Sequence, residues 1–285
     1  MQSEINKITI IGAGTMGNGI AHVFALNNFK VDLFDTEQSA LSNGMLSITK
    51  NLDRQVKKGT ITNEVKQQTL SNIQPINELN RLDINTNLVI EAIVENYEAK
   101  SLLFNKLNDI INDNCIFASN TSSISITQLA RSSRQDKFIG MHFMNPVPMM
   151  SLVEIIKGYD TSEDTFQTIH KLVNRINKVP VLVNDYPGFI ANRILMPMIN
   201  EAIFALYENV ASAEDIDTVM KLGMNHPMGP LTLADFIGLD VCLAIMEVLY
   251  NGFNDSKYRP CPLLKKMVSA GKLGRKTKKG FFKYE

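Results

Sequence analysis

The sequence predicts an α/β fold: a Rossmann-like, doubly wound, mostly parallel sheet followed by a second, all-helical domain. Up to residue 186, short β-branched runs alternate with longer segments of helical periodicity, which is typical of a parallel sheet. After Pro187-Gly188 the strand pattern ends and apolar residues recur at helical spacing. We therefore expect a first domain over 1–186 and an all-helical domain over 187–285.

The expected strands of the first domain are almost wholly apolar, as strands covered on both faces should be. A strand over 7–11 is followed by a helix over 16–26 and a second strand over 29–34, which ends at Asp35. The remaining elements alternate, with strands at 87–93, 115–119, 138–143, 151–156 and 179–183 and helices at 97–112 and 162–177.

The connection between Asp35 and the strand at 87 is about fifty residues long, more than an ordinary crossover needs. Residues 38–58 have helical periodicity and stop at Lys57-Lys58-Gly59, and a second helix can begin after Thr62. We expect a helical hairpin over about 38–72 that projects from the sheet and adds a substrate-specific piece.

The second domain shows helical spacing in four segments, with a stiff turn between two of them at Asn225-His226-Pro227-Met228-Gly229-Pro230. The expected helices lie at 189–209, 213–222, 232–250 and 262–270.

Composition excludes several function classes. Lys plus Arg and Asp plus Glu both number 29, so a net charge of zero gives no case for a nucleic-acid binder or a polybasic membrane anchor. The most apolar stretches, 189–207 and 231–250, contain charged residues that break any membrane span. No signal peptide is visible at the N-terminus. We expect a soluble cytoplasmic protein.

The three cysteines, Cys115, Cys242 and Cys261, are odd in number and far apart. They match neither the spacing of a zinc or redox site nor a disulfide framework. Reduced thiols and no bound metal are therefore expected.

Gly12-Ala13-Gly14-Thr15-Met16-Gly17 directly follows a strand and opens a helix. The glycines permit a tight turn, a close approach to a pyrophosphate and close helix–strand packing, and the helix N-terminus favours phosphate. Asp35 closes the next strand, where a carboxylate can bind an adenosine ribose. Because Thr36-Glu37 follow with no Arg or Lys nearby, NAD is favoured over NADP. The alternative is a glycine turn with an incidental acid.

Histidine is the natural candidate for acid–base chemistry, and the chain has four. Packing or surface positions are the favoured interpretation for His22, His170 and His226. His142 ends an apolar strand, and sites in open α/β sheets lie at such ends. Glu154 lies in the next apolar strand, where a buried carboxylate would need a partner. A His–Glu couple would orient and charge the imidazole, but spacing alone leaves open whether the two meet.

Seven motifs stand in the order found in one family, and together they span essentially the whole chain. The motifs lie at 12–17, 119–123, 141–148, 152–154, 187–193, 226–230 and 274–277. On these motifs the chain resembles the L-3-hydroxyacyl-CoA dehydrogenases, and its bare two-domain length is most similar to the short-chain 3-hydroxybutyryl-CoA members.

The resemblance implies a set of catalytic residues. His142 would take the 3-hydroxyl proton while hydride leaves C3 for the nicotinamide, and Glu154 would hold the imidazole and stabilise its cation. Ser122 and Asn192 would hydrogen-bond the reacting oxygens, and Asn192 would place the active site in the interdomain cleft. Without the resemblance, Ser122 could merely cap a helix and Asn192 could be an ordinary exposed helix start.

The resemblance also implies contacts with NAD from Glu95, Lys100, Asn120, Ser122, Asn145 and Lys276. Without it, Glu95 and Lys100 could belong to a solvated helix face. One departure touches this set: Lys278-Lys279 stand where the family usually has a glycine. If that position requires a positive φ, a lysine there is strained, which puts the role of Lys276 in doubt.

Lys50, Arg54 and Lys57 or Lys58 recur at helical spacing and place several cations on one helix face. Such a stripe suits the three phosphoryl groups of coenzyme A, although a solvated basic face is an equal alternative. The resemblance implies that Asn51, Arg54, Lys58 and Ser122 contact an acyl-CoA substrate.

Two other functions remain open at this point: a related NAD-dependent dehydrogenase of a CoA-free hydroxy acid, of the L-gulonate or carnitine type, and a catalytically silent NAD-binding protein. The basic stripe and the long hairpin favour the CoA substrate. The resemblance further implies a homodimer formed through the helical domain.

Overall fold

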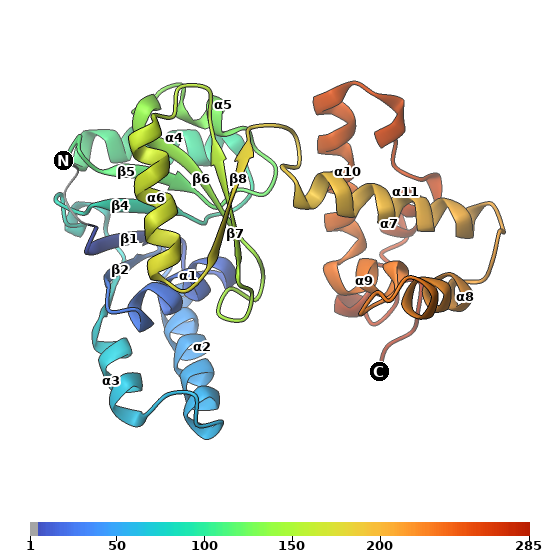
Figure 1. The fold of residues 1–285 in the computed structure, drawn as a ribbon, viewed down its shortest axis with the longest axis horizontal. Helices are drawn as coiled ribbons and strands as arrows, with labels where there is room; N and C mark the ends of the chain where they lie inside the picture. The colour runs from blue at the N-terminus through green and yellow to red at the C-terminus, as the bar shows by residue number, and fades with distance from the viewer. Residues whose placement is uncertain (1–4) are drawn as a thin grey trace. The chain divides into compact units, whose positions relative to one another are not determined.

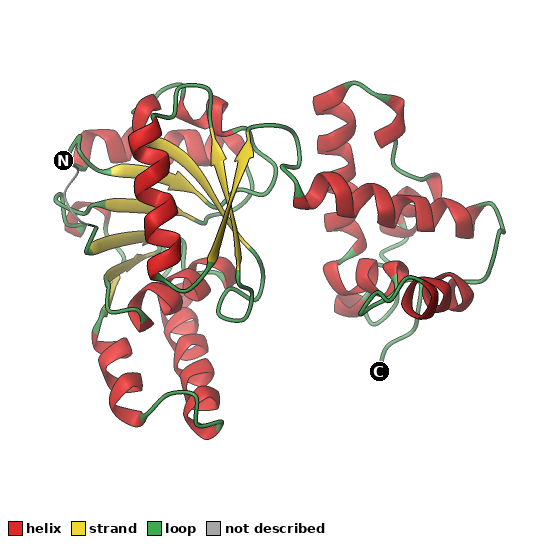
Figure 2. Cartoon of the chain, viewed as in Figure 1, coloured by secondary structure: helices red, strands yellow, loops and turns green. Residues whose placement is uncertain are grey.

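The structure is a computed structural model that describes residues 5–285 and divides into two compact units, one ending at Asp185 and one beginning at Tyr186 (Figure 1). Residues 1–4, where most of the opening segment examined for a signal peptide lies, are outside the described residues. The first unit holds one eight-stranded sheet with helices on it, and the second consists of helices and loops (Figure 2). The predicted α/β fold with an all-helical second part is confirmed.

Strands and helices alternate along most of the first unit, with the exceptions of the helix pair α2–α3 and the strand pairs β3–β4 and β6–β7. Its elements are β1 (Lys7–Ile11), α1 (Thr15–Leu26), β2 (Lys30–Phe34), α2 (Gln38–Lys57), α3 (Asn63–Ser71), β3 (Ile73–Ile76), β4 (Leu88–Glu91), α4 (Tyr97–Ile110), β5 (Ile116–Ser119), α5 (Ile126–Ala130), β6 (Phe138–Phe143), β7 (Leu152–Lys157), α6 (Glu163–Arg175) and β8 (Val179–Asn184).

The sheet has the order β3-β2-β1-β4-β5-β6-β7-β8, and all neighbouring strands are parallel except the antiparallel pair β6 and β7. The strand order reverses between β1 and β4. In doubly wound folds a dinucleotide binds at the carboxyl ends of the strands beside this reversal.

Two strands differ from the prediction. The segment Ile73–Ile76 forms strand β3, which was not predicted because Gln74 and Pro75 interrupt its apolar pattern; a sheet edge tolerates proline because one side needs no ladder hydrogen bonds. The expectation that every strand is covered on both faces is wrong for β8, the opposite edge, where Val179 and Leu182 are exposed.

Alternating residues of the central strands pack on two opposite faces. Ile116 and Ala118 belong to the core shared with Phe24 of α1. Between them, Phe117 points to the other face, where the Phe104 ring of α4 lies 5.7 Å from it, centroid to centroid. Helices therefore cover both faces of the central strands, and a ligand can reach these strands at their carboxyl ends.

The predicted helical hairpin is formed by α2 and α3, which extend away from the sheet (Figure 1). Gly59 ends α2 with φ +72°, and the Thr62 hydroxyl begins α3 by accepting a hydrogen bond from Val65 N. The inner face of α2 buries Leu41, Ile48 and Leu52, which leaves its polar face outside.

The second unit contains α7 (Ala191–Tyr207), α8 (Ala213–Thr218), α9 (Pro230–Ile237), α10 (Leu239–Phe253) and α11 (Pro262–Ser269). The single helix expected over 232–250 is wrong: Gly238, with φ +106°, separates α9 from α10. The helix expected over 213–222 is α-helical only to Thr218 and continues as a π-helical turn over Val219–Gly223.

Within the described residues, no helix is both long and apolar enough to cross a membrane. The same part of the chain has no cluster of three or more His, Cys, Asp or Glu side chains that could hold a metal ion. The three cysteines are buried and unpaired.

Candidate active site

The glycines of the loop after β1 have the three expected properties. Gly12 has φ +102°, and a Cβ there would lie 2.6 Å from the carbonyl oxygen of Ala92. A Cβ on Gly17 would lie 1.7 Å from the Gly12 carbonyl oxygen, so helix and strand pack too closely for a side chain. A Cβ on Gly14 would have no other atom within 4 Å. The loop therefore presents an open backbone surface at the N-terminus of α1, which fits a pyrophosphate.

A cavity of about 630 Å³ opens beside this loop. Asp35 lines it, and the Asp35 carboxylate accepts hydrogen bonds from Ala13 N at 2.8 Å and Glu37 N at 3.0 Å. These bonds fix the carboxylate at the end of β2, where a ribose hydroxyl can reach it. The rest of the cavity wall comes from segments far from the glycine motif in the sequence, so the motif did not predict it. These residues are Leu79, Val94, Leu102, Leu103 and Lys106.

The structure brings His142 and Glu154 together. They face each other across the antiparallel pair β6 and β7, and Nδ1 of His142 lies 2.7 Å from Oε2 of Glu154. Both residues are buried, at 8% and 2% exposed. Directly paired residues in antiparallel strands lie on the same face, so the strand register itself sets this contact. The arrangement is that of a base held by a carboxylate.

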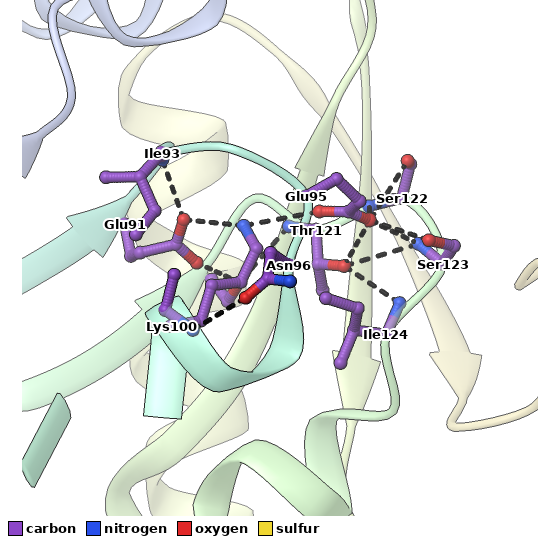
Figure 3. A network of polar contacts seen from close by, with 11 residues as sticks. Glu91, Ile93, Glu95, Asn96, Lys100, Thr121, Ser122, Ser123 and Ile124 are labelled. Atoms are coloured by element: carbon purple, nitrogen blue, oxygen red, sulfur yellow. Dashed lines mark hydrogen bonds and ion pairs between the residues drawn. The ribbon is translucent and has the colours of Figure 1, made fainter. Parts of the chain in front are cut away.

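Ser122 lies in the turn after β5, and Glu95 is the acceptor around which this turn is arranged (Figure 3). Oε1 of Glu95 accepts from Ser122 N at 2.9 Å, Ser123 N at 3.0 Å and the Thr121 hydroxyl at 2.6 Å. The alternative in which Ser122 caps a helix is wrong, because α5 is capped by Ser125.

Lys100 is almost completely buried, at 1% exposed, so its assignment to a solvated helix face is wrong. Its ammonium lies 2.6 Å from Oε1 of Glu91 and 3.2 Å from Oε2 of Glu95. Burial acts to raise the pKa of Glu95, but the Lys100 charge and the hydrogen bonds from the turn outweigh it and hold that pKa below its ordinary value. Contact of Lys100 with NAD stays a prediction.

Glu91 was missed by the sequence analysis. It ends β4, is fully buried, and accepts from the Ser119 hydroxyl at 2.5 Å and Ile93 N at 2.7 Å. Burial raises its pKa, although Lys100 and Ser119 act against this. The signal was present: a carboxylate at the end of an apolar strand needs a buried partner, which is the reasoning that singled out Glu154.

Two predicted asparagines lie near the end of β6. Asn120 accepts a hydrogen bond from Phe143 N at 2.9 Å and so joins the turn after β5 to the strand that carries His142. Asn145 lines a second cavity, of about 290 Å³, together with Lys50, Asn51 and Arg54 of α2. Part of the predicted basic stripe therefore faces a cavity that the β6–β7 loop also lines. Lys58 is not among its lining residues.

The β6–β7 loop is held from below by a buried cation. The Lys178 ammonium donates to the carbonyl oxygens of Val147 at 2.7 Å and Met150 at 2.5 Å. Burial lowers the pKa of Lys178. The loop that lines the second cavity is therefore anchored by Lys178 through two of its carbonyl groups.

In the second unit, Asn192 is the second residue of α7 and is buried at 9% exposed, so its assignment to an ordinary exposed helix start is wrong. Lys276 is ion-paired with Asp240 at 2.5 Å, a partner that the sequence analysis did not predict. Lys278 has φ +58°, the strained left-handed conformation anticipated for a lysine at this position.

Comparison with known proteins gives a consistent result over the full chain. Residues 7–186 match the 3-hydroxyacyl-CoA dehydrogenase NAD binding domain, and residues 188–284 match the C-terminal domain of the same family. A 3-hydroxybutyryl-CoA dehydrogenase of Bradyrhizobium diazoefficiens is 53% identical over 285 residues, covering 100% of this chain and 97% of that protein.

A mitochondrial hydroxyacyl-coenzyme A dehydrogenase of Homo sapiens is 41% identical, covering 99% of this chain and 92% of the relative. The crystal structure of (S)-3-hydroxybutyryl-CoA dehydrogenase from Ralstonia eutropha superposes with a TM-score of 0.96 at 48% identity, covering 99% and 100% of the two chains. The fold, the dinucleotide loop and these matches agree, and the chain belongs to the family of NAD-dependent 3-hydroxyacyl-CoA dehydrogenases.

Proposed function

We propose that this protein interconverts L-3-hydroxybutyryl-CoA and acetoacetyl-CoA. The bound pair His142–Glu154, with 2.7 Å between Nδ1 and Oε2, carries the proposal because it supplies a base for the 3-hydroxyl proton. Similarity to relatives named 3-hydroxybutyryl-CoA dehydrogenase, 50–54% identical over nearly the whole chain, supports the short acyl length.

NAD, when bound in the cavity beside Gly14 and Asp35, supplies the acceptor for the hydride that leaves C3 of the substrate. His142 takes the hydroxyl proton through Nε2, since Glu154 already holds Nδ1. Glu154 fixes the ring orientation and stabilises the imidazolium that forms. In the reduction, the same imidazolium returns the proton to the new alkoxide.

Ser122 is proposed to bind the reacting oxygen from the turn that Glu95 organises. Asn192 is proposed to bind a substrate oxygen from the second unit, on the strength of the family resemblance. The family resemblance also supports a set of proposed NAD contacts. They are the glycine loop, Asp35, Asn120, Glu95, Lys100, Asn145 and Lys276.

The CoA phosphates are proposed to bind along the outer face of α2. Lys50, Asn51 and Arg54 line one cavity there and place two cations and an amide close together. Lys58 and Lys57 are exposed at the end of the same helix and can add charge for the more distant phosphates.

A cytoplasmic homodimer is the proposed physiological form. Support for the dimer comes from the second unit, where an apolar cavity of about 450 Å³ lies beside the exposed side chains of Val210 and Val219. Support for the cytoplasm comes from the three unpaired thiols.

The test is NADH consumption by the purified protein with acetoacetyl-CoA as the only acceptor. A clear rate, much weaker with NADPH, is the expected result. A protein that binds NADH but gives no rate would contradict the CoA substrate, and acceptors without CoA, such as 3-oxo derivatives of sugar acids or of carnitine, would be tried next.

A further inference from the structure

We infer that Glu91 is a positioning residue for catalysis, acting through Lys100 and Glu95 on the turn that carries Ser122. The catalytic part of this inference rests on the proposed function. Its structural part rests only on the contacts of Glu91, Lys100 and Glu95.

Glu91 has no access to solvent, so it acts through other residues rather than on a substrate. Its carboxylate joins the loops that follow two neighbouring strands. It accepts from Ile93 N, in the loop after β4 that lines the dinucleotide cavity, and from the Ser119 hydroxyl at the end of β5. One side chain therefore fixes the wall of the cavity and the start of the turn after β5.

The Lys100 ammonium lies between two carboxylates (Figure 3). Its shorter contact, 2.6 Å, is with Glu91, and its longer contact, 3.2 Å, is with Glu95. Glu91 therefore holds the ammonium on one side, and the ammonium holds Oε2 of Glu95 on the other. The Glu95 side chain is 37% exposed, so it needs such a restraint more than Glu91 does.

The turn after β5, which carries Ser122, is held by Glu95. With Oε2 directed to Lys100, Oε1 of Glu95 collects five donors from three consecutive residues: two backbone amides and the hydroxyls of Thr121, Ser122 and Ser123. Accepting several hydrogen bonds requires a charged carboxylate in a fixed place. A shift of Lys100 would move Glu95 and, with it, the Ser122 hydroxyl.

The charges predict how each member responds to substitution. Glu91→Gln keeps the shape and an acceptor for Ile93 N, but leaves Lys100 with Glu95 as its one anionic partner. The ammonium then shifts toward Glu95. Lys100→Met leaves two carboxylates close together without a cation between them, so one of them keeps a proton near neutral pH. The double variant removes both charges and leaves Glu95 with its five donors.

Two measurements test the inference. In hydrogen–deuterium exchange, Glu91→Gln should speed exchange of the Ser122 and Ser123 amides by about tenfold or more, while the amides of β1 stay unchanged. In the acetoacetyl-CoA assay, the same variant should lose about tenfold in kcat, since sub-ångström misplacement of a positioning group has costs of this order. Glu98→Gln, an exposed carboxylate on α4, is the matched control and should change neither quantity.

The Lys100→Met variant should lose about a hundredfold in kcat near pH 7 and recover activity as pH rises, because its shared proton is then released. This rise of activity with pH should be absent in Glu91→Gln/Lys100→Met, and the double variant should be more active than Lys100→Met alone. Unchanged amide exchange, unchanged kcat, or a double variant whose loss is the product of the two single losses would each overturn the inference. An inactive wild-type protein would overturn the proposed function, and the exchange measurement would still decide the role of Glu91.

Discussion

The four histidines show how far the surroundings of a residue decide its role. His142 is held by a carboxylate, whereas His22 is fully buried in α1, and Nε2 of His22 is 3.4 Å from an amide nitrogen of Gln55. Burial lowers the pKa of His22 to about 4. One imidazole is therefore equipped to exchange protons, and the other is kept neutral.

His142→Ala is expected to reduce turnover by a factor on the order of 10²–10⁴, because the proton then has no positioned acceptor. NADH affinity should stay nearly unchanged, since His142 is not among the residues that line the dinucleotide cavity. Steady-state rates with acetoacetyl-CoA and a fluorescence titration with NADH separate the two quantities. His170→Ala, on helix α6, is the control, and equal activity of His142→Ala and wild type would remove His142 from the mechanism.

The low pKa of His22 makes stability depend on pH. The unfolded chain binds the proton near pH 6.5 and the folded chain only near pH 4, so the stabilising difference is complete above pH 6.5 and is lost as pH falls toward 4. At pH 5 the expected loss is about 2 kcal/mol. Urea unfolding of wild type and His22→Gln at pH 7.5 and 5 measures it. An equal loss in both proteins would assign the effect to other groups.

At the scale of elements, helix α2 combines a buried apolar face with cations that line a cavity. Lys50→Gln/Arg54→Gln is expected to raise KM for acetoacetyl-CoA about tenfold at low salt, and less at high salt, with kcat changed less than twofold. Kinetics with the N-acetylcysteamine thioester of acetoacetate, which has no phosphates, provide the matched substrate control. A similar rise in KM for both thioesters would show that the substitutions perturb the site in another way.

Most elements could be predicted from the sequence because the spacing of apolar residues in a buried strand or an amphipathic helix shows which of its faces are buried. Strand β3 could not, since an edge strand with a proline has no such pattern. The break at Gly238 was hidden because apolar spacing continues across it. The Glu91–Lys100 contact depends on which strands and helices lie side by side, and periodicity does not record this.

At the scale of the whole molecule, each unit has its own core and each carries part of the predicted site. The glycine loop and Asp35 follow from local patterns. Local patterns also marked His142 and Glu154 singly, but their contact became clear only from the pairing of β6 with β7. The assignments of Asn192 and Lys276 depend on the resemblance, because nothing in their own segments marks them as functional.

A homodimer formed through the second unit should have twice the mass of the chain in light scattering after gel filtration. Val219→Glu is expected to shift the protein toward the monomer, because Val219 is exposed beside the apolar cavity. Tyr159→Glu, at an exposed site of the first unit, is the control. A monomeric wild type would contradict the dimer.

The position of His142 opposite Glu154 has a consequence for the order in which the protein folds. The two residues are twelve apart on adjacent strands, whereas the parallel strands β1 and β4 pair across about eighty residues. Short loops close at a lower entropic cost, so the β6–β7 hairpin is the part of the sheet best placed to form early. Pulse-labelled hydrogen exchange during refolding should protect the amides of β6 and β7 before those of β1. The proton-transfer pair would then be assembled before there is anywhere for the dinucleotide to bind.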